Sequence, residues 1–243
     1  MKSPPRPATE ETMRSFGPVD EKLEEADFFL DELAASEDDL LRTRFHFSAF
    51  VSSIRTVTFA LQASLSDAPG FAEWYAGQRD ALRRNRLSRF FHECRTDGQH
   101  LGLNQINFVA ADGMGTRYHF GQPERDRYEY LPEEDVLTAC RSQMALICGV
   151  IDAAYREFGL LIDPDQIYTP DGLSRLSKSI EDVEEELGLP RGFTDIPWDG
   201  PDKEARRLAH LRRNIPGSGI KPILMKHLGR ELDYPIGPFH PGS

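Results

Sequence analysis

The chain has 243 residues, of which 39% are hydrophobic and 28% are charged, and its formal net charge is −11. This composition excludes an integral membrane protein and a wholly disordered chain, and the length is sufficient to bury a core without metals or disulfides. The three cysteines lack CxxC spacing, which argues against a disulfide scaffold or a zinc knuckle. Because the first residues also lack the apolar core of a secretory signal, we expect a cytoplasmic protein.

Charge is distributed unevenly along the chain. Residues 1–40 hold twelve acidic and four basic side chains, a local charge of −8, so the remaining residues sum to only −3. Two basic islands lie in that remainder, at 79–95 and at 203–230. Because the local field matters more than the net charge, the acidic total does not exclude a polyanionic partner such as RNA.

The N-terminal part predicts a tail and the start of a helical domain. Residues 1–18 contain four prolines and little that could pack, so we expect a disordered tail. Apolar residues then recur at helical spacing over 20–35, which predicts an amphipathic surface helix. The following Ser36-Glu37-Asp38-Asp39 resembles a capping box that starts a second helix.

The second helix, which runs to Asp67, is apolar on nearly all sides, as is typical of a central helix covered by its neighbours. Its main stripe and three residues of a later helix form the expected core: Phe50, Ile54, Val57, Leu61, Met144, Ile147 and Ile151. Ser52 and Arg55 interrupt this apolar surface. Arg55 could face a functional pocket, or it could form a buried ion pair with an acidic residue of the first helix.

The middle of the chain predicts three more helices and one hairpin. Helices are expected at 71–84 and 87–94, followed by a β-hairpin at about 104–120 that turns at Asp112-Gly113. A long helix begins at Pro132 and is expected to stop at Gly159. The sequence therefore predicts an all-α helical bundle over 19–159 with an inserted β-hairpin.

The composition changes after Gly159, because residues 160–243 hold ten of the 17 prolines. Only 174–187 and 203–213 have helical patterns there, so we expect a Pro-rich accessory extension with a loose end from Tyr234. Four arginines of the second of these helices are candidates for binding nucleic-acid phosphates. They are Arg206, Arg207, Arg212 and Arg213.

Motifs for common cofactors are missing from the sequence. Gly113-Met114-Gly115 falls in the predicted hairpin turn, and there is no Walker lysine or HExxH sequence. His92, Glu93 and His100 could be imagined as metal ligands, but the two histidines are eight residues apart and no third ligand is evident. We therefore expect neither a metal nor a cofactor.

Arg95-Thr96-Asp97-Gly98-Gln99-His100 is the remaining candidate for chemistry. An arginine fork matches phosphate oxygens, and a histidine both accepts and donates a proton near neutral pH. Residues five apart on a continuous helix point about 140° apart, so we expect Gly98 to break the helix and let Arg95 and His100 turn toward one pocket. The simpler interpretation is that Arg95 caps the helix end and His100 is a polar loop residue.

The segment from Phe45 to Gly102 resembles the HEPN superfamily of small α-helical domains, and the resemblance covers roughly residues 20–158. It rests on a long apolar second helix, an amphipathic helix and a helix that ends in R-x(4)-H. The resemblance implies a metal-independent endoribonuclease built from two paired protomers. Arg95 would hold the scissile phosphate, and His100 would act on the 2′-hydroxyl or the leaving oxygen. The family often has Asn after the arginine, where this chain has Thr96.

The sequence leaves several functions open. The leading hypothesis is an RNA-cleaving or RNA-binding homodimer of the toxin or defence type, with an antitoxin-like protein partner. Arg95 and His100 would be catalytic, with Arg55, Ser52 and Thr96 around them. The alternative is a non-catalytic interaction protein that uses its acidic N-terminal helix and its basic extension. A third interpretation is a sensor that binds a small ligand or nucleotide in the same pocket.

Overall fold

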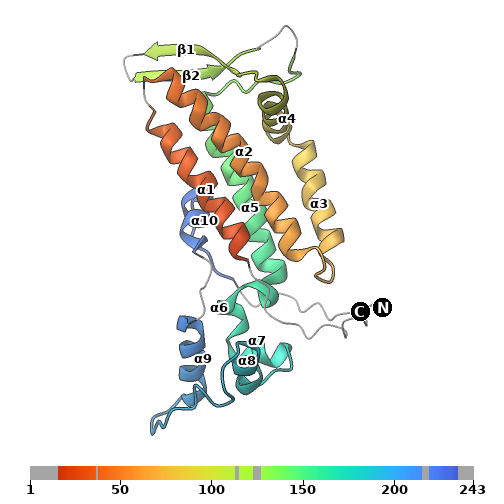
Figure 1. The fold of residues 1–243 in the computed structure, drawn as a ribbon, viewed down its shortest axis with the longest axis vertical. Coiled ribbons are helices and arrows are strands. Elements are labelled where there is room, and N and C mark those ends of the chain that lie inside the picture. The colour runs from red at the N-terminus through yellow and green to blue at the C-terminus, as the bar shows by residue number, and fades with distance from the viewer. Residues whose placement is uncertain (1–15, 37, 113–114, 123–126, 215–218, 235–243) are drawn as a thin grey trace, which may run out of the picture. The chain divides into compact units, whose positions relative to one another are not determined.

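The computed structural model describes residues 16–36, 38–112, 115–122, 127–214 and 219–234, without the side chains of 107–112, 115 and 214. The fold is all-α with one hairpin, as the sequence predicts. The elements in chain order are α1 Gly17–Ala34, α2 Leu40–Leu65, α3 Phe71–Arg84, α4 Arg86–Leu101, β1 Ile106–Asp112, β2 Gly115–Phe120, α5 Val136–Ile162, α6 Pro164–Ile167, α7 Pro170–Arg175, α8 Ile180–Glu186, α9 Lys203–Asn214 and α10 Lys221–Leu228 (Figure 1).

The described chain divides into two units. The bundle unit contains 16–152 and 219–232, and the extension unit contains 153–214 and 233–234. The sequence assigned everything after residue 159 to one accessory extension. The structure instead groups 219–232, which include α10, with the bundle.

The start of the bundle differs from two expectations. The predicted tail of 1–18 is too long, because α1 begins at Gly17 and Phe16 is buried; residues 1–15 lie outside the described part. The expected capping box, whose Glu37 is also not described, is not what starts α2. Instead, one carboxylate oxygen of Asp39 accepts from the backbone N–H groups of Leu41 and Arg42, both at 3.0 Å. A side-chain oxygen at this position satisfies amides that have no partner within the helix.

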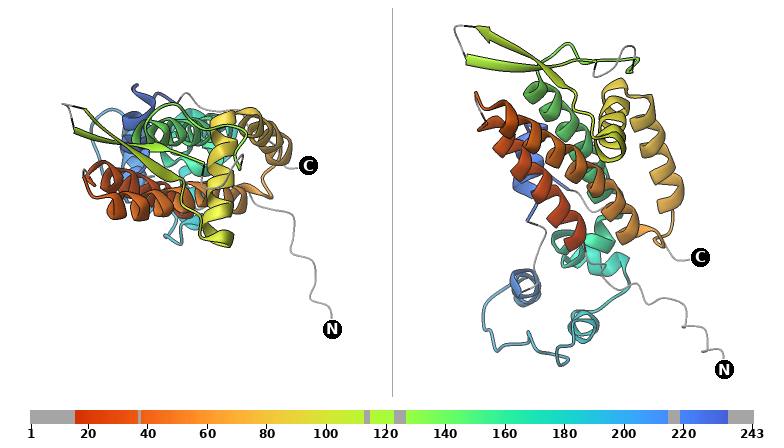
Figure 2. Two further views of the ribbon diagram at one scale, coloured as in Figure 1. Left: turned by 90° about the horizontal axis from the view of Figure 1, so that it is seen from above. Right: turned by 45° about the horizontal axis from the view of Figure 1, so that its top comes forward.

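The core of the bundle unit is the predicted one. All seven expected core residues are buried. Four of them lie on α2 and three on α5, and none is more than 3% exposed. α2 lies against α1 along its length (Figures 1 and 2). The periodic apolar stripes therefore predicted correctly which faces of the two long helices are removed from water.

The hairpin closes the end of the bundle at which α2 begins (Figures 1 and 2). Antiparallel pairing joins β1 to β2, while the predicted turn at Gly113 lies outside the described residues. The Phe120 ring of β2 lies 5.6 Å from the Phe47 ring of α2 and 4.9 Å from the Phe90 ring of α4, measured between centroids. The Arg44 guanidinium also donates to the Ile106 carbonyl at 2.8 Å. These contacts fix the hairpin on α2 and α4.

The segment after the extension returns to the bundle through charged contacts with α1. Lys226 of α10 lies 2.9 Å from a carboxylate oxygen of Asp27 and 2.8 Å from Asp31, and His227 contacts Asp27 at 2.5 Å. Arg230 pairs with Asp152 of α5 at 2.6 Å. The acidic face of α1 is thus partly neutralised within the chain.

The long helix α5 does not stop at Gly159 as predicted. Its backbone leaves the helical region at Phe158 and the helix then continues to Ile162. A β-carbon at position 159 would overlap the Gln166 side chain, so this glycine permits a close approach rather than a helix end.

The extension unit has its own small core. The predicted helix at 174–187 is divided, because Ser177 has a φ of 53° between α7 and α8, and Ser179 caps α8. The core of this unit consists of Ile167, Tyr168, Leu173, Ile180, Val183, Leu208 and Leu211. Within the described ranges of both units, no helix has the length and apolar character required to cross a membrane.

Candidate anion-binding pocket

The R-x(4)-H segment lies on one continuous helix. α4 runs from Arg86 to Leu101, so the predicted break at Gly98 is wrong. The helix ends at Gly102, whose φ of 64° is the left-handed geometry that glycine tolerates best. Within one chain, Arg95 and His100 therefore point about 140° apart.

The surroundings of the two expected catalytic residues also differ. Arg95 is half-buried and its Nε has no hydrogen-bond partner, whereas His100 is exposed in the last turn of α4. Thr96 is exposed and donates its hydroxyl to the His92 carbonyl at 3.0 Å. The assignment of Arg95 and His100 to catalysis stays a prediction.

Asp97 is the buried residue of this segment, and no sequence pattern singles it out. Its carboxylate forms an ion pair with Arg127 and accepts from the Tyr128 hydroxyl at 2.7 Å. The Arg127 contact lowers the pKa of Asp97, against the opposing effect of burial. Asp97 thus ties one turn of α4, the turn that contains Gly98, to the loop after the hairpin.

A cavity of the bundle unit lies next to this segment, between α2, α3, α4 and α5. Its volume is about 520 Å³, within the range of pockets that hold small ligands. Its buried lining is largely apolar and consists of Val51, Ile54, Thr58, Phe91, Gln143 and Ile147. Its exposed or half-exposed lining is rich in basic and aromatic groups and includes Arg55, Phe59, Tyr75, Arg79, Arg83, Arg89 and His92.

Positive charge dominates the rim of this cavity. Four arginines come from three helices, with Arg55 on α2, Arg79 and Arg83 on α3, and Arg89 on α4. Glu93 is the one carboxylate among the described residues that line the cavity. Asp80 lies 3.6 Å from Arg83 on the exposed face of α3. The rim therefore carries more positive charge than its neighbours neutralise.

Arg55 is the most constrained of these arginines. It donates to the Thr58 hydroxyl at 2.9 Å, and its guanidinium lies over the Phe59 ring. Its buried Nε has no hydrogen-bond partner, and no described carboxylate pairs with the side chain. Of the two alternatives left open by the sequence, the ion pair with the first helix is therefore wrong. Ser52, expected beside it, does not line the cavity.

Burial and neighbouring positive charges both act on the Arg55 guanidinium. Burial lowers the pKa of Arg55; Tyr75 opposes this effect, and the positive charges of Arg95 and Arg83 add to it. A buried guanidinium near other guanidiniums is stabilised when an anion binds among them.

His92 is subject to the same positive field. Burial lowers the pKa of this imidazole, and the charges of Arg55 and Arg95 lower it further, against the opposing effect of Glu93. A bound anion would oppose those charges and favour the imidazolium. His92 was considered in the sequence as a metal ligand, but the described residues contain no group of three or more His, Cys, Asp or Glu placed to bind a metal.

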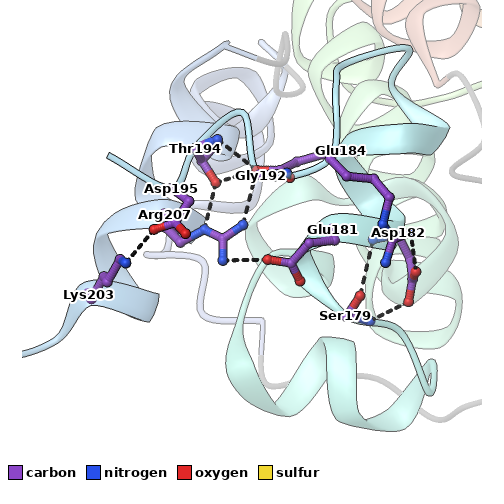
Figure 3. Close-up of polar contacts among 10 residues, drawn as sticks. Ser179, Glu181, Asp182, Glu184, Gly192, Thr194, Asp195, Lys203 and Arg207 are labelled. Carbon is purple, nitrogen blue, oxygen red and sulfur yellow. Dashed lines mark hydrogen bonds and ion pairs between the residues drawn. The ribbon is translucent and has the colours of Figure 1, made fainter. Parts of the chain in front are cut away.

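The basic extension helix has two kinds of arginine. Arg207 is held in a network around Glu184, where it contacts Glu181 at 2.6 Å and the Thr194 hydroxyl at 2.9 Å (Figure 3). Arg212 donates to the Tyr168 carbonyl at 2.6 Å. These two guanidiniums are engaged in the fold of the extension unit and are poorly placed to contact a nucleic acid.

The other two candidates on α9 face solvent. Arg206 lies over the Trp198 ring at 3.4 Å from its centroid, and Arg213 is exposed. Neither forms an ion pair with a described carboxylate. Of the four arginines expected to bind nucleic acid, Arg206 and Arg213 are therefore the two that remain accessible.

Sequence patterns pointed to only some of the residues that line the cavity. Arg79, Arg83 and Arg89 were visible as a basic island, and Arg55 as a charge on an apolar helix. Helical spacing of three and four places Arg79 with Arg83, and Arg89 with His92, on common helix faces. Gln143 carried no signal, because a single polar residue on a long helix is unremarkable in sequence.

The fold and the cavity define a helical-bundle protein with an inserted hairpin and a basic pocket. The profile of the family described as bacteriophage lambda protein ea47 matches residues 10–158, more than half of the chain. The chain belongs to this family. All residues that line the cavity fall inside the matched range.

The family match corrects the resemblance suggested by the sequence. The chain matches the ea47 family and not the HEPN superfamily, so the R-x(4)-H spacing of Arg95 and His100 does not identify a HEPN domain. A short motif on an apolar helical bundle was too unspecific to separate the two. No curated protein and no solved structure matches the chain.

Proposed function

We propose that this protein binds a phosphate-bearing ligand in the pocket between α2, α3, α4 and α5. The observation that carries the proposal is the convergence of Arg55, Arg79, Arg83 and Arg89 on one cavity whose described lining contains a single carboxylate. Guanidinium groups bind phosphate oxygens through paired hydrogen bonds. The Arg55 guanidinium lines the cavity and forms no ion pair with a described carboxylate, so an anion there would supply its charge partner.

The lining supports a ligand with two chemically different parts. Basic groups lie at the exposed rim, while Val51, Ile54, Phe91 and Ile147 form a buried apolar floor. A free inorganic anion would leave that floor in contact with water. A phosphate ester with a largely apolar or flat body fits both parts, since apolar surface is then removed from water as the charge is neutralised.

RNA is included in this proposal because a strand can also carry a terminal phosphate. The terminal phosphate of an RNA strand has the charge and oxygens that the pocket would bind. Independently of the pocket, Arg206 and Arg213 are accessible positive charges of the extension unit. Arg95 and His100, the two residues expected to be catalytic, do not line this pocket, so we propose binding rather than cleavage as its function. A cytoplasmic location is also part of the proposal, supported by the free, buried thiols of Cys94, Cys140 and Cys148.

The alternative of an interaction protein has less support. It relied on the acidic first helix and the basic extension as surfaces for other proteins. Asp27 and Asp31 of α1 instead pair with Lys226 of α10 inside the same chain. The charges that were to attract a partner are therefore partly satisfied.

Calorimetric titration with nucleoside 5′-monophosphates and with a 5′-phosphorylated short RNA tests the proposal. We expect Arg55→Gln and Arg89→Gln to weaken binding at least about tenfold, because each loses a charged hydrogen-bond donor to the phosphate. Arg84→Gln is the matched control, since Arg84 is exposed on α3 and does not line the cavity. The proposal fails if no phosphate ester binds, or if Arg84→Gln weakens binding as much as Arg55→Gln.

A further inference from the structure

We infer that the floor of the pocket recognises a nucleobase, with Gln143 of α5 as the residue that hydrogen-bonds its edge. This inference rests on the proposed phosphate binding and names the ligand class. It starts from a buried amide: the Gln143 side chain lines the cavity and the residue is only 5% exposed. Its Oε1 accepts from the Ser88 hydroxyl at 3.0 Å. None of the described residues accepts a hydrogen bond from its Nε2.

The surroundings of this amide define what can occupy the floor. Val51, Ile54, Phe91 and Ile147 are buried apolar residues on the same floor. An aliphatic chain bound there would cover the Gln143 amide and leave its donors without acceptors, which is costly in an apolar environment. A flat heterocycle presents apolar faces to these side chains and a ring nitrogen or carbonyl oxygen to the amide.

The floor and the rim of the pocket have different chemistry, and together they indicate the ligand. The floor accepts a flat ring with a hydrogen-bonding edge, and the rim of Arg55, Arg79, Arg83 and Arg89 accepts a phosphate. A nucleoside monophosphate joins these two parts in one molecule. The same unit occurs free in solution and at the phosphorylated end of an RNA strand, so the shared ligand chemistry is a nucleotide with a terminal phosphate.

Ser88 acts in this arrangement as a positioning residue. It lies in the first turn of α4, where its backbone N–H donates to the Asn85 side chain at 2.9 Å. Its hydroxyl then holds one side of the Gln143 carboxamide at 3.0 Å. Holding the oxygen fixes the direction of the amide N–H groups, which are the donors available to a base.

The test compares ligands that differ only by the base. Calorimetric titrations with uridine 5′-monophosphate, adenosine 5′-monophosphate and ribose 5-phosphate measure the contribution of the ring. We expect at least one of the two nucleotides to bind at least about tenfold more tightly than ribose 5-phosphate, as expected for a hydrogen-bonded ring removed from water. Equal affinity for all three ligands overturns the base recognition while leaving phosphate binding intact.

Variants separate the base from the phosphate. Gln143→Leu should reduce nucleotide affinity to the level of ribose 5-phosphate and leave ribose 5-phosphate binding unchanged. Ser88→Ala, which keeps the amide but removes its orientation, should lose part of the same preference. Gln62→Leu is the matched control at the exposed rim and should keep the preference. Undiminished preference in Gln143→Leu, with folding verified by thermal unfolding, contradicts the role of Gln143.

Two further arms complete the design. A 5′-phosphorylated tetraribonucleotide that binds more tightly than the free nucleotide assigns the ligand to an RNA end, and equal or weaker binding assigns it to the free nucleotide. Arg55→Gln should weaken the binding of the nucleotides and of ribose 5-phosphate to the same extent. If none of the phosphate esters binds the parent protein, the proposed function itself fails, and the inference fails with it.

Discussion

The guanidinium carbon of Arg55 lies 4.4 Å from the centroid of the Phe59 ring, one turn further along α2. The ring holds the guanidinium through the attraction between a cation and an aromatic face. The same side chain keeps a buried Nε without a hydrogen-bond partner. Arg55 is therefore positioned at the pocket by a contact that leaves hydrogen-bonding capacity for an anion.

The pH dependence of anion binding should depend on His92. Because burial, Arg55 and Arg95 lower the pKa of His92, the imidazole of the unliganded protein gains its proton at a lower pH than an ordinary histidine does. A bound anion favours the charged form, so affinity should rise as the pH falls from about 8 to about 5. Sulfate is the suitable probe, because it stays fully ionised over this range.

The measurement is the sulfate affinity of the parent and of His92→Gln at several pH values. We expect the variant to lose most of the increase at low pH, while keeping binding at high pH through the arginines. His119→Gln serves as a control outside the cavity lining. A pH profile that is the same in His92→Gln and in the parent contradicts this role of His92.

Because α2 is the central helix of the bundle, shortening one of its buried side chains should strongly lower the stability of the protein. Leu61 is completely buried, and Leu61→Ala should lower the free energy of unfolding by roughly 2–5 kcal/mol, through lost burial and the cavity left behind. Leu41→Ala is the same change on the same helix at a residue that is 60% exposed, and it should change stability by less than about 0.5 kcal/mol. Chemical denaturation measures both, and similar costs at the two sites would contradict the assigned faces of α2.

The Glu184 network predicts an acid-sensitive extension unit. Burial would raise the pKa of Glu184, but hydrogen bonds from Thr194, Gly192 and Arg207 outweigh it and lower the pKa to about 2, from an ordinary value of 4.5. Because the folded-state pKa is depressed, the carboxylate contributes its full stability above the unfolded value. That contribution is lost as the pH falls from 4.5 toward about 2.

Thermal unfolding of Glu184→Gln checks this linkage. At neutral pH the variant should be destabilised by about 1–3 kcal/mol, because Arg207 keeps only Glu181 as a carboxylate partner and the Gly192 and Thr194 N–H groups lose a charged acceptor. The difference in stability between the variant and the parent should become smaller as the pH falls from 4.5 toward about 2. Glu185→Gln, at an exposed neighbouring position paired with Arg191, should be nearly neutral at every pH. A difference that stays constant with pH would show that the charge of Glu184 is not responsible.

The four arginines of α9 should separate into two functional pairs. Replacing Arg206 and Arg213 by Gln should weaken RNA binding and flatten its dependence on salt, since each phosphate contact releases counterions. Replacing Arg207 and Arg212 should instead lower the unfolding temperature, because both side chains hold the extension unit together. An unchanged salt slope in the first double variant would remove α9 from the RNA-binding surface.

Catalysis by Arg95 and His100 predicts a homodimer. The two side chains diverge on α4 within one chain, so a shared site needs Arg95 of one protomer and His100 of another. If this arrangement exists, light scattering at micromolar concentration gives a dimer, and His100→Ala loses RNA cleavage in EDTA while keeping its fold. A monomer, or a His100→Ala variant that cleaves as fast as the parent, rules out this site.

Local periodicity by itself determined the architecture of the bundle. Apolar residues three and four apart marked the buried faces of α2 and α5, and all seven residues predicted from them are buried. Alternation around Asp112 marked the hairpin. These features follow from the chain's own repeat, because a helix or strand must present its apolar residues on one face before it can pack.

Only the tertiary structure decided where α4 ends and which charges meet. A glycine inside a helix costs only about 1 kcal/mol, less than the combined contacts of Asp97 with Arg127 and Tyr128 on the same turn. The helix therefore continues past Gly98. Arg55, Arg89 and Gln143 are far apart in sequence, and helix packing alone brings them to one cavity. No local pattern encodes that convergence, because it depends on how four helix faces are oriented around a common core.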